Sequence, residues 1–187
     1  MPICPYDTEE TGWDDFLYVK VLASKQRRIA TIMTLLLLCL LLGCLVGLRS
    51  LTAPAVVCWA AHLGWLNFAG TKLAFIDRPV TLVVLTLLAV FELIADKLPK
   101  TPARTAPLGL IARIVLGCLC GAALATSAGG KLLLPAIVGV VGALIGTFAG
   151  YQARHTLVFR AHVPDFAVAM AEDVIAVAGS LLVVTHV

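Results

Sequence analysis

Residues 91–104 read FELIADKLPKTPAR, where a long apolar run closes on charged residues before the chain breaks at Pro99. Glu92 and Asp96 are four residues apart, so on a helix they lie on one face. Carboxylates inside or at the rim of a membrane helix are costly, and they usually face a bundle interior, a water-filled cavity or a partner charge. This stretch is therefore the first place to look for a polar site in an apolar fold.

The composition of the whole chain indicates an integral membrane protein. The 187 residues are 60% hydrophobic and 13% charged, and the mean hydropathy is +1.00. Soluble domains are about 45–50% apolar and about 25% charged. The net charge of +3 is small and the basic residues are scattered over loops, so we expect the lipid bilayer as partner and no nucleic acid.

Apolar runs long enough to cross a bilayer recur on both sides of the opening stretch. A spanning helix needs about 20 consecutive apolar residues, and the sequence has about five such runs. We therefore expect an all-α integral membrane protein. The predicted spans are 29–48, 79–98, 108–125, 132–150 and 166–184.

One further apolar segment, 53–66, is shorter than a span. It has about fourteen residues and includes Pro54 and His62, so we predict a re-entrant or interfacial half-helix. The polar start of the chain is different again. We expect residues 1–28 to form a cytoplasmic tail with a short amphipathic helix, and residues 29–187 to form a single transmembrane helical domain.

Glycines recur at helical spacing in three of the predicted spans. Small residues four apart make a helix face that another helix can approach closely. The pattern predicts tight packing and favours a homo-oligomer or a place in a larger membrane complex. The glycines are Gly43 and Gly47, Gly117 and Gly121, and Gly142, Gly146 and Gly150.

The orientation follows from the basic residues near the helix ends, which favour the cytoplasm. If 53–66 is re-entrant, nine lie on the N-terminal side of the membrane and four on the other; if it spans, the count becomes seven against six. We expect a multi-pass protein of the bacterial inner membrane with a cytoplasmic N-terminus and an external C-terminus. The nine are Lys20, Lys25, Arg27, Arg28, Lys97, Lys100, Arg104, Arg154 and Arg160, and the four are Arg49, Lys72, Arg78 and Lys131.

Two segments in different halves of the chain resemble each other. LVGLRSLT at 45–52 and FAGYQARHTL at 148–157 both have a glycine-bearing helix end followed by an arginine and a hydroxyl. In the expected topology the two halves would be inverted, which is a recurrent plan of transporters. Chance similarity between segments rich in glycine, leucine and alanine is the alternative.

Charged residues within the apolar segments are the candidate site residues. Glu172 and Asp173 are adjacent about a third of the way into the last span, where acids must be paired, protonated or wet. We predict Arg113 as their main partner, and a purely structural ion pair is the alternative. The candidate acids are Glu92, Asp96, Glu172 and Asp173, and the candidate charge partners are Arg49, Lys97, Arg113 and Arg154.

Three blocks of the sequence also resemble a known family. ELIADKLPKTPARTAP, GYQARHTL and PDFAVAMAEDVIAV are similar to the bacterial membrane proteins grouped as domain of unknown function 4126. The resemblance covers roughly residues 40–185. It implies no activity, and it implies that five residues occupy the family's polar positions: Glu92, Asp96, Lys97, Glu172 and Asp173.

From these features we expect a transporter or channel for a small cation or a proton, in which the acids bind the ion and the arginines balance the charge. A membrane enzyme acting on a lipid headgroup and a structural or accessory subunit of a membrane complex are the alternatives. An enzyme is the less favoured class, because the chain has no HExxH, GxSxG or Walker loop. The histidines lack ligands at metal-binding spacing, so we predict no metal site and no cofactor.

Overall fold

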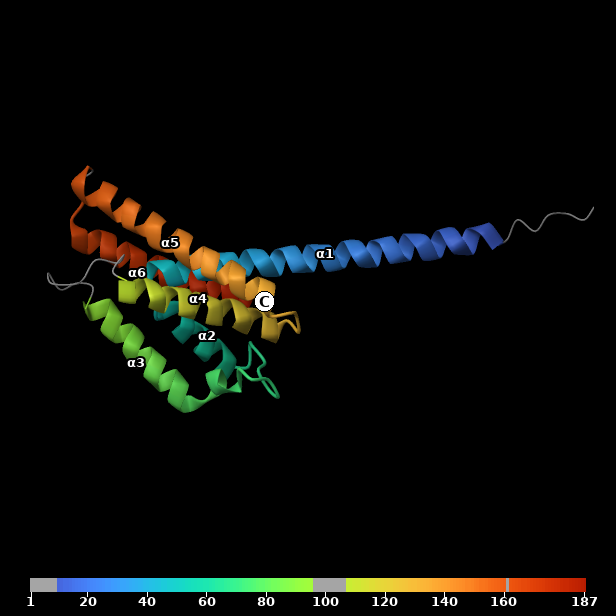
Figure 1. The fold of residues 1–187 in the computed structure, drawn as a ribbon, viewed down its shortest axis with the longest axis horizontal. Coiled ribbons are helices and arrows are strands. Elements are labelled where there is room, and N and C mark those ends of the chain that lie inside the picture. Colours follow the sequence, from blue (N-terminus) through green and yellow to red (C-terminus); the bar gives the residue numbers. More distant parts are fainter. Residues whose placement is uncertain (1–9, 96–106, 161) are drawn as a thin grey trace, which may run out of the picture. The chain divides into compact units, whose positions relative to one another are not determined.

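The computed structural model describes residues 10–95, 107–160 and 162–187, and every regular element in this part of the chain is a helix (Figure 1). The prediction of an all-α fold is therefore confirmed. The elements are α1 (Glu10–Leu48), α2 (Thr52–His62), the 3₁₀ helix η1 (Ala74–Asp77), α3 (Pro79–Ala95), α4 (Pro107–Ser127), α5 (Leu133–Phe159) and α6 (Asp165–Thr185).

The chain divides into two units within α1. The first unit, Met1–Thr34, is described from Glu10 onward, and those residues are the first part of the helix. The second unit, Leu35–Val187, contains the rest of α1 and all the other helices.

Four of the described helices have the length and apolar composition to cross a bilayer, namely the Tyr18–Leu48 part of α1, α4, α5 and α6. The protein is therefore a multi-pass membrane protein. The other predicted span, 79–98, corresponds to α3, which is apolar but has 17 described residues. Helix α5 ends at Phe159 and is thus longer than the predicted span 132–150.

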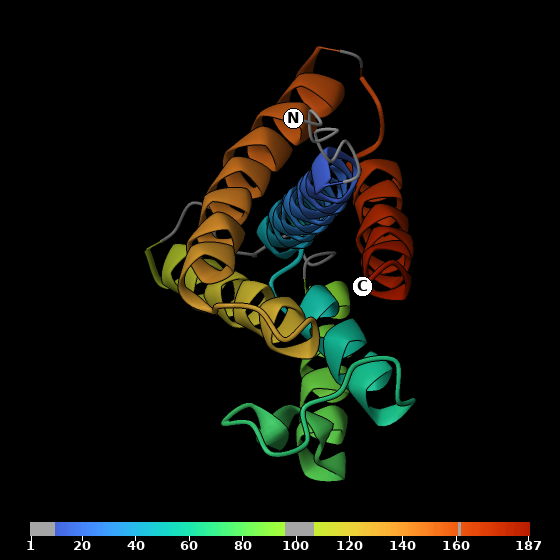
Figure 2. The ribbon, with the colours of Figure 1, turned by 90° about the vertical axis from the view of Figure 1, so that its right-hand side faces the viewer.

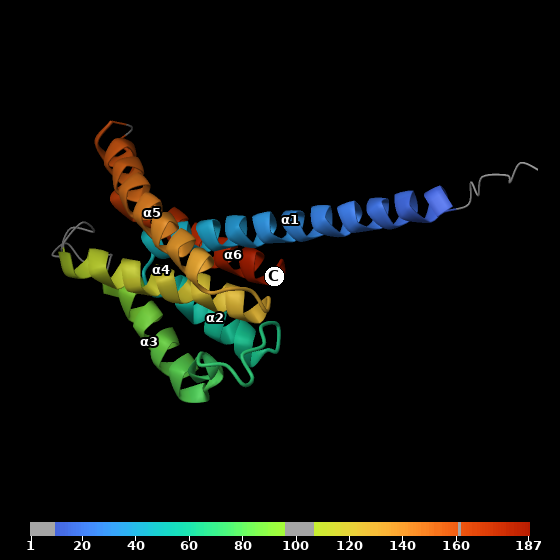
Figure 3. The same cartoon turned by 45° about the vertical axis from the view of Figure 1, so that its right-hand side comes forward.

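The predicted glycine faces are where α1, α4 and α5 touch. A side-chain carbon added at Gly43 would collide with the carbonyl oxygen of Gly139, and one added at Gly146 would collide with that of Cys44. Helices α4 and α5 cross in the same way (Figure 3), and a Cβ at Gly117 would lie 2.8 Å from the Gly139 oxygen. The prediction of close packing is confirmed, because only glycine leaves room for these backbone contacts.

Residues 35–48 of α1 lie between α5 and α6 (Figure 2). Gly43 meets Gly139 and Gly47 meets Thr147, so α1 and α5 run in the same direction. The two similar segments at the ends of these helices therefore point the same way. The predicted inverted relation between them is wrong.

Helix α2 is an inner helix. Nine of its 11 residues are buried, and it packs against α3, α4 and α6. Neighbouring helices therefore cover nearly all of this segment. A helix of this length is stable here because protein surrounds it on most sides.

Helices α2 and α3 are antiparallel. The Ser50 amide, just before α2, donates to Glu92 near the end of α3 at 2.8 Å, and the Trp59 indole N–H donates to the Thr86 hydroxyl at 3.1 Å. The end of α3 therefore returns to the start of α2. The predicted topology, which put Arg49 and the end of α3 on opposite sides of the membrane, is wrong.

Candidate functional site

Charged side chains converge where α1, α3 and α5 end and where α2 and α6 begin. The ends of α3 and α5 and the start of α6 are seen together in Figure 1. We call this group of charged side chains the ionic cluster. Its members are Arg49, Glu92, Arg154, Asp165, Glu172 and Asp173.

The first contact in the ionic cluster joins α1 to α6. Arg49 follows the last residue of α1, is 1% exposed, and its Nη2 lies 2.5 Å from Oδ1 of Asp173. The same nitrogen donates to the carbonyl oxygen of Ala169 at 3.4 Å. Asp173 comes eight residues after the start of α6, which is roughly 12 Å along the helix axis. This is a buried ion pair in a helix of spanning length, and breaking a buried pair by removing one partner is costly.

The second contact is a carboxylate at a helix start. Oε1 and Oε2 of Glu92 accept the backbone N–H groups of Ser50 and Leu51, both at 2.8 Å. The first N–H groups of a helix have no partner within the helix, and negative charge is favoured there. Leu51 offers no side-chain cap to α2. Glu92 of α3 therefore supplies the missing cap, across the break between α1 and α2.

The third contact joins α5 to α6. Nε and Nη2 of Arg154 donate to the two carboxylate oxygens of Asp165, each at 2.8 Å, and Nη1 lies 3.6 Å from Oε2 of Glu172. The paired geometry with Asp165 is the strong form of an arginine–carboxylate contact. Arg154 thus binds two acids of α6 that lie about two turns apart.

The adjacent acids of α6 have different arginine partners. Glu172 is directed toward Arg154 of α5, and Asp173 toward Arg49 at the end of α1. Neighbouring residues on a helix point about 100° apart, so one helix reaches two others. Both arginines were among the predicted charge partners. Arg113, the partner favoured from the sequence, is buried in α4.

Two predicted site residues, Asp96 and Lys97, lie outside the described residues. The structure also adds one residue that the sequence did not indicate. Asp165 is largely exposed in the first turn of α6, and its carboxylate pairs with Arg154. No local pattern in the sequence announces that pairing.

Buried hydroxyls extend the polar face of α6. Ser180 is completely buried, and it lies two turns beyond Asp173 on the same face, with buried Ala176 between them. Within the described part of the chain, its Oγ and the Oγ1 of Thr52 have no hydrogen-bond partner. Buried polar atoms of this kind call for an explanation such as a water or an ion.

The comparisons with known proteins give a family and nothing beyond it. The family model described as a domain of unknown function, number 4126, matches residues 36–186, which include the whole ionic cluster. No curated protein and no solved structure matches the chain. Among the described residues, no group of three or more histidine, cysteine, aspartate or glutamate side chains could hold a metal ion.

Proposed function

The chain belongs to the family grouped as domain of unknown function 4126, and we propose that its function is to carry a proton or a small cation across the membrane. The observation that carries this proposal is the buried pair of Arg49 and Asp173. Ionisable residues inside membrane helices commonly mark the path of an ion or a proton. A pair that can exchange one positive partner for another suits that role.

The proposed step takes place at Asp173. In the resting arrangement its carboxylate holds the Arg49 guanidinium. When a proton or a small cation binds the carboxylate, the guanidinium moves away from it and keeps its hydrogen bond to the carbonyl oxygen of Ala169. The carboxylate keeps one positive partner throughout, so Asp173 is never left as a lone buried anion.

Two features of the structure support such a step. The chain is broken between α1 and α2, directly at Arg49, and interrupted helices of this kind accompany ion sites in transporters. The buried hydroxyls of Ser180 and Thr52 provide oxygen atoms that lack hydrogen-bond partners in the described part of the chain. These hydroxyl oxygens could bind an ion after it leaves the Asp173 carboxylate.

The placement in the membrane is part of the proposal. We propose that α2 and α3 form a re-entrant hairpin, because the 11 residues of α2 reach only about 16 Å, against about 30 Å for the hydrocarbon core. Lys20, Lys25, Arg27 and Arg28 precede the apolar run and support a cytoplasmic N-terminus in a plasma membrane. We also propose a homo-oligomer, since the small number of helices in one chain would not enclose a pathway well.

The test is ion flux into liposomes that contain the purified full chain. We expect wild-type protein to dissipate a proton or cation gradient, and Asp173→Asn to abolish that flux while the protein stays folded. Asp77→Asn is the matched control, because Asp77 is an exposed acid of η1 outside the ionic cluster. Loss of flux in both variants, or flux retained in Asp173→Asn, would argue against the proposed step.

The structural alternative also has support. Each described acid of the ionic cluster already holds a partner: Glu92 two backbone N–H groups, Asp165 and Glu172 the guanidinium of Arg154, and Asp173 that of Arg49. A membrane scaffold or accessory subunit would use such contacts only to hold helices together. Absence of flux in wild-type liposomes, combined with loss of folded protein in Asp173→Asn, would favour this alternative.

A further inference from the structure

We propose that the C-terminal end of α5 binds the phosphate headgroup of an anionic phospholipid. The site lies on a different face of α5 from Arg154 and uses none of the residues of the ionic cluster. It would therefore stand even if the proposed transport function failed.

The site is a half-open surface cavity of about 320 Å³ along the last three turns of α5. This volume is at the lower end for small-molecule sites, which begin at about 300 Å³. The residues that line it offer a guanidinium, an imidazole, two hydroxyls and an amide, and they include no acid. They are Tyr151, Gln152, His155, Thr156 and Arg160.

The two arginines near the end of α5 differ in their partners. Arg154 is directed at α6, where Asp165 and Glu172 hold its guanidinium. Arg160 is exposed at the end of the helix, and its side chain makes no hydrogen bond or ion pair in the described part of the chain. A guanidinium presents a planar set of donors that matches a phosphate group. Arg160 is therefore the available anion-binding group of this cavity.

The cavity continues into an apolar stripe on the same helix face. Side chains four or three residues apart share a face of a helix, and the exposed apolar residues of α5 fall in register with Gln152 and His155. The residues of this stripe are Ile137, Val141, Ile145 and Phe148. The glycines that pack against α1 and α4 lie on the opposite face of α5. The stripe is thus the face that acyl chains would cover, directly below a headgroup in the cavity.

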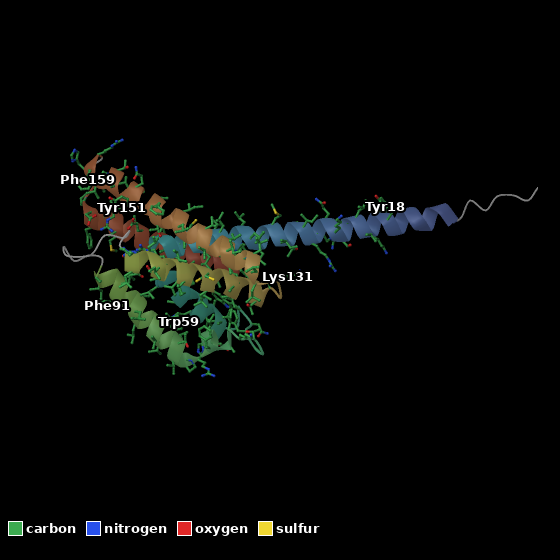
Figure 4. The ribbon with its side chains drawn as sticks, in the orientation of Figure 1. Tyr18, Trp59, Phe91, Lys131, Tyr151 and Phe159 are labelled. Carbon is green, nitrogen blue, oxygen red and sulfur yellow. The ribbon has the colours of Figure 1, made fainter. Side chains whose placement is uncertain are left out.

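The length of α5 places the cavity at headgroup level. Its 27 residues extend about 40 Å, and the hydrocarbon core is about 30 Å thick. Tyr151 and Phe159 are exposed at this end of the helix (Figure 4). Aromatic side chains are enriched at the membrane–water interface. A lipid phosphate fits this setting better than free phosphate, because the cavity opens onto an apolar surface.

The experiment is native mass spectrometry of the full chain in detergent, with phosphatidylglycerol and phosphatidylcholine of identical acyl chains added in turn. We expect wild-type protein to retain phosphatidylglycerol in preference to phosphatidylcholine. The double variant His155→Gln/Arg160→Gln should lose this preference, and Arg160→Lys should keep part of it. Both positions are exposed, so the variants should remain folded, which circular dichroism would check.

The matched control is Lys131→Gln, since Lys131 is an exposed cation just before the other end of α5 (Figure 4). This variant should retain the wild-type preference. An equal loss in Lys131→Gln would mean that only net charge matters and would overturn the proposal. Displacement of the lipid by excess inorganic phosphate would show that the lipid is not the natural occupant. An unchanged preference in the double variant would show that His155 and Arg160 do not bind the headgroup.

Discussion

The glycine-packed centre and the ionic cluster hold the same helices together by different means. In the centre, α1, α4 and α5 approach so closely that a Cβ at Gly146 would collide with the carbonyl oxygen of Cys44. In the ionic cluster, the helices are joined by long side chains such as Arg49 and Arg154. Glycine packing admits one arrangement, whereas a charged contact can change partners. The first region is suited to a rigid frame and the second to a step that moves charge.

The largest effect should come from breaking the buried ion pair on one side only. Arg49→Gln leaves the Asp173 carboxylate without its arginine in the interior, and such a loss costs about 3–5 kcal/mol of stability. We expect a clear fall in the thermal unfolding temperature in detergent. Arg78→Gln is the control, because Arg78 is exposed just before α3, and its variant should unfold like wild type. Equal stability of both variants would contradict a buried pair.

The next effect should come from filling the glycine-packed centre. Gly146→Leu forces a side chain into the backbone of α1, and overpacking typically costs about 1–3 kcal/mol, occasionally more. Leu144→Ala, two residues away and half-buried, should disturb folding and assembly less. Size-exclusion profiles and unfolding temperatures of the two variants would show the difference. Small and equal effects would mean that this face of α5 is exposed to lipid and does not pack against α1.

A smaller effect should come from the cap of α2. Glu92→Ala removes both acceptors from the Ser50 and Leu51 amides, and loss of a helix cap costs about 0.5–2 kcal/mol. Glu92→Gln keeps one carbonyl acceptor and should lose less. Acetate added to Glu92→Ala should restore part of the lost stability, because it can fill the same anion position. The unfolding temperature with acetate, against an equal concentration of chloride, measures this rescue.

The smallest effect should come from the exposed end of the ionic cluster. The side chain of Asp165 is 59% exposed, and exposed ion pairs contribute about 0–1 kcal/mol. Asp165→Asn should therefore change the unfolding temperature slightly, and less at high salt than at low salt. A loss as large as that of Arg49→Gln would show that Asp165 is a principal anchor of α6.

The features of the molecule that depend on local sequence could be predicted from the chain. Apolar length sets the spans of α1, α4, α5 and α6, and the spacing of Gly43 and Gly47 or of Gly142 and Gly146 marks the packing faces. The pairing of the charges could not be predicted in the same way. That Asp173 meets Arg49 depends on the rotation of α6 and on which helix ends meet, and no spacing along the chain encodes that.

The error in topology has a specific physical cause. The segment that forms α2 is too short to span the membrane. From the sequence we therefore expected the chain to return, before α3 begins, to the side of the membrane on which α1 ends. In the structure, protein surrounds α2, and its backbone groups are satisfied within the helix and by Glu92. A short helix at membrane depth is tolerated when it is buried in protein. Arg49 and Glu92 therefore share one end.

Ion flux through the double variant Arg49→Gln/Asp173→Asn in liposomes separates an ion path from a structural contact. Replacing both members of a buried ion pair by neutral groups is often harmless to stability, so this protein should fold and assemble like wild type. If Asp173 binds the moving ion, the double variant should be folded and should carry no flux, while Asp77→Asn carries wild-type flux. Wild-type flux in the folded double variant would contradict the central claim and would leave the pair of Arg49 and Asp173 a structural contact.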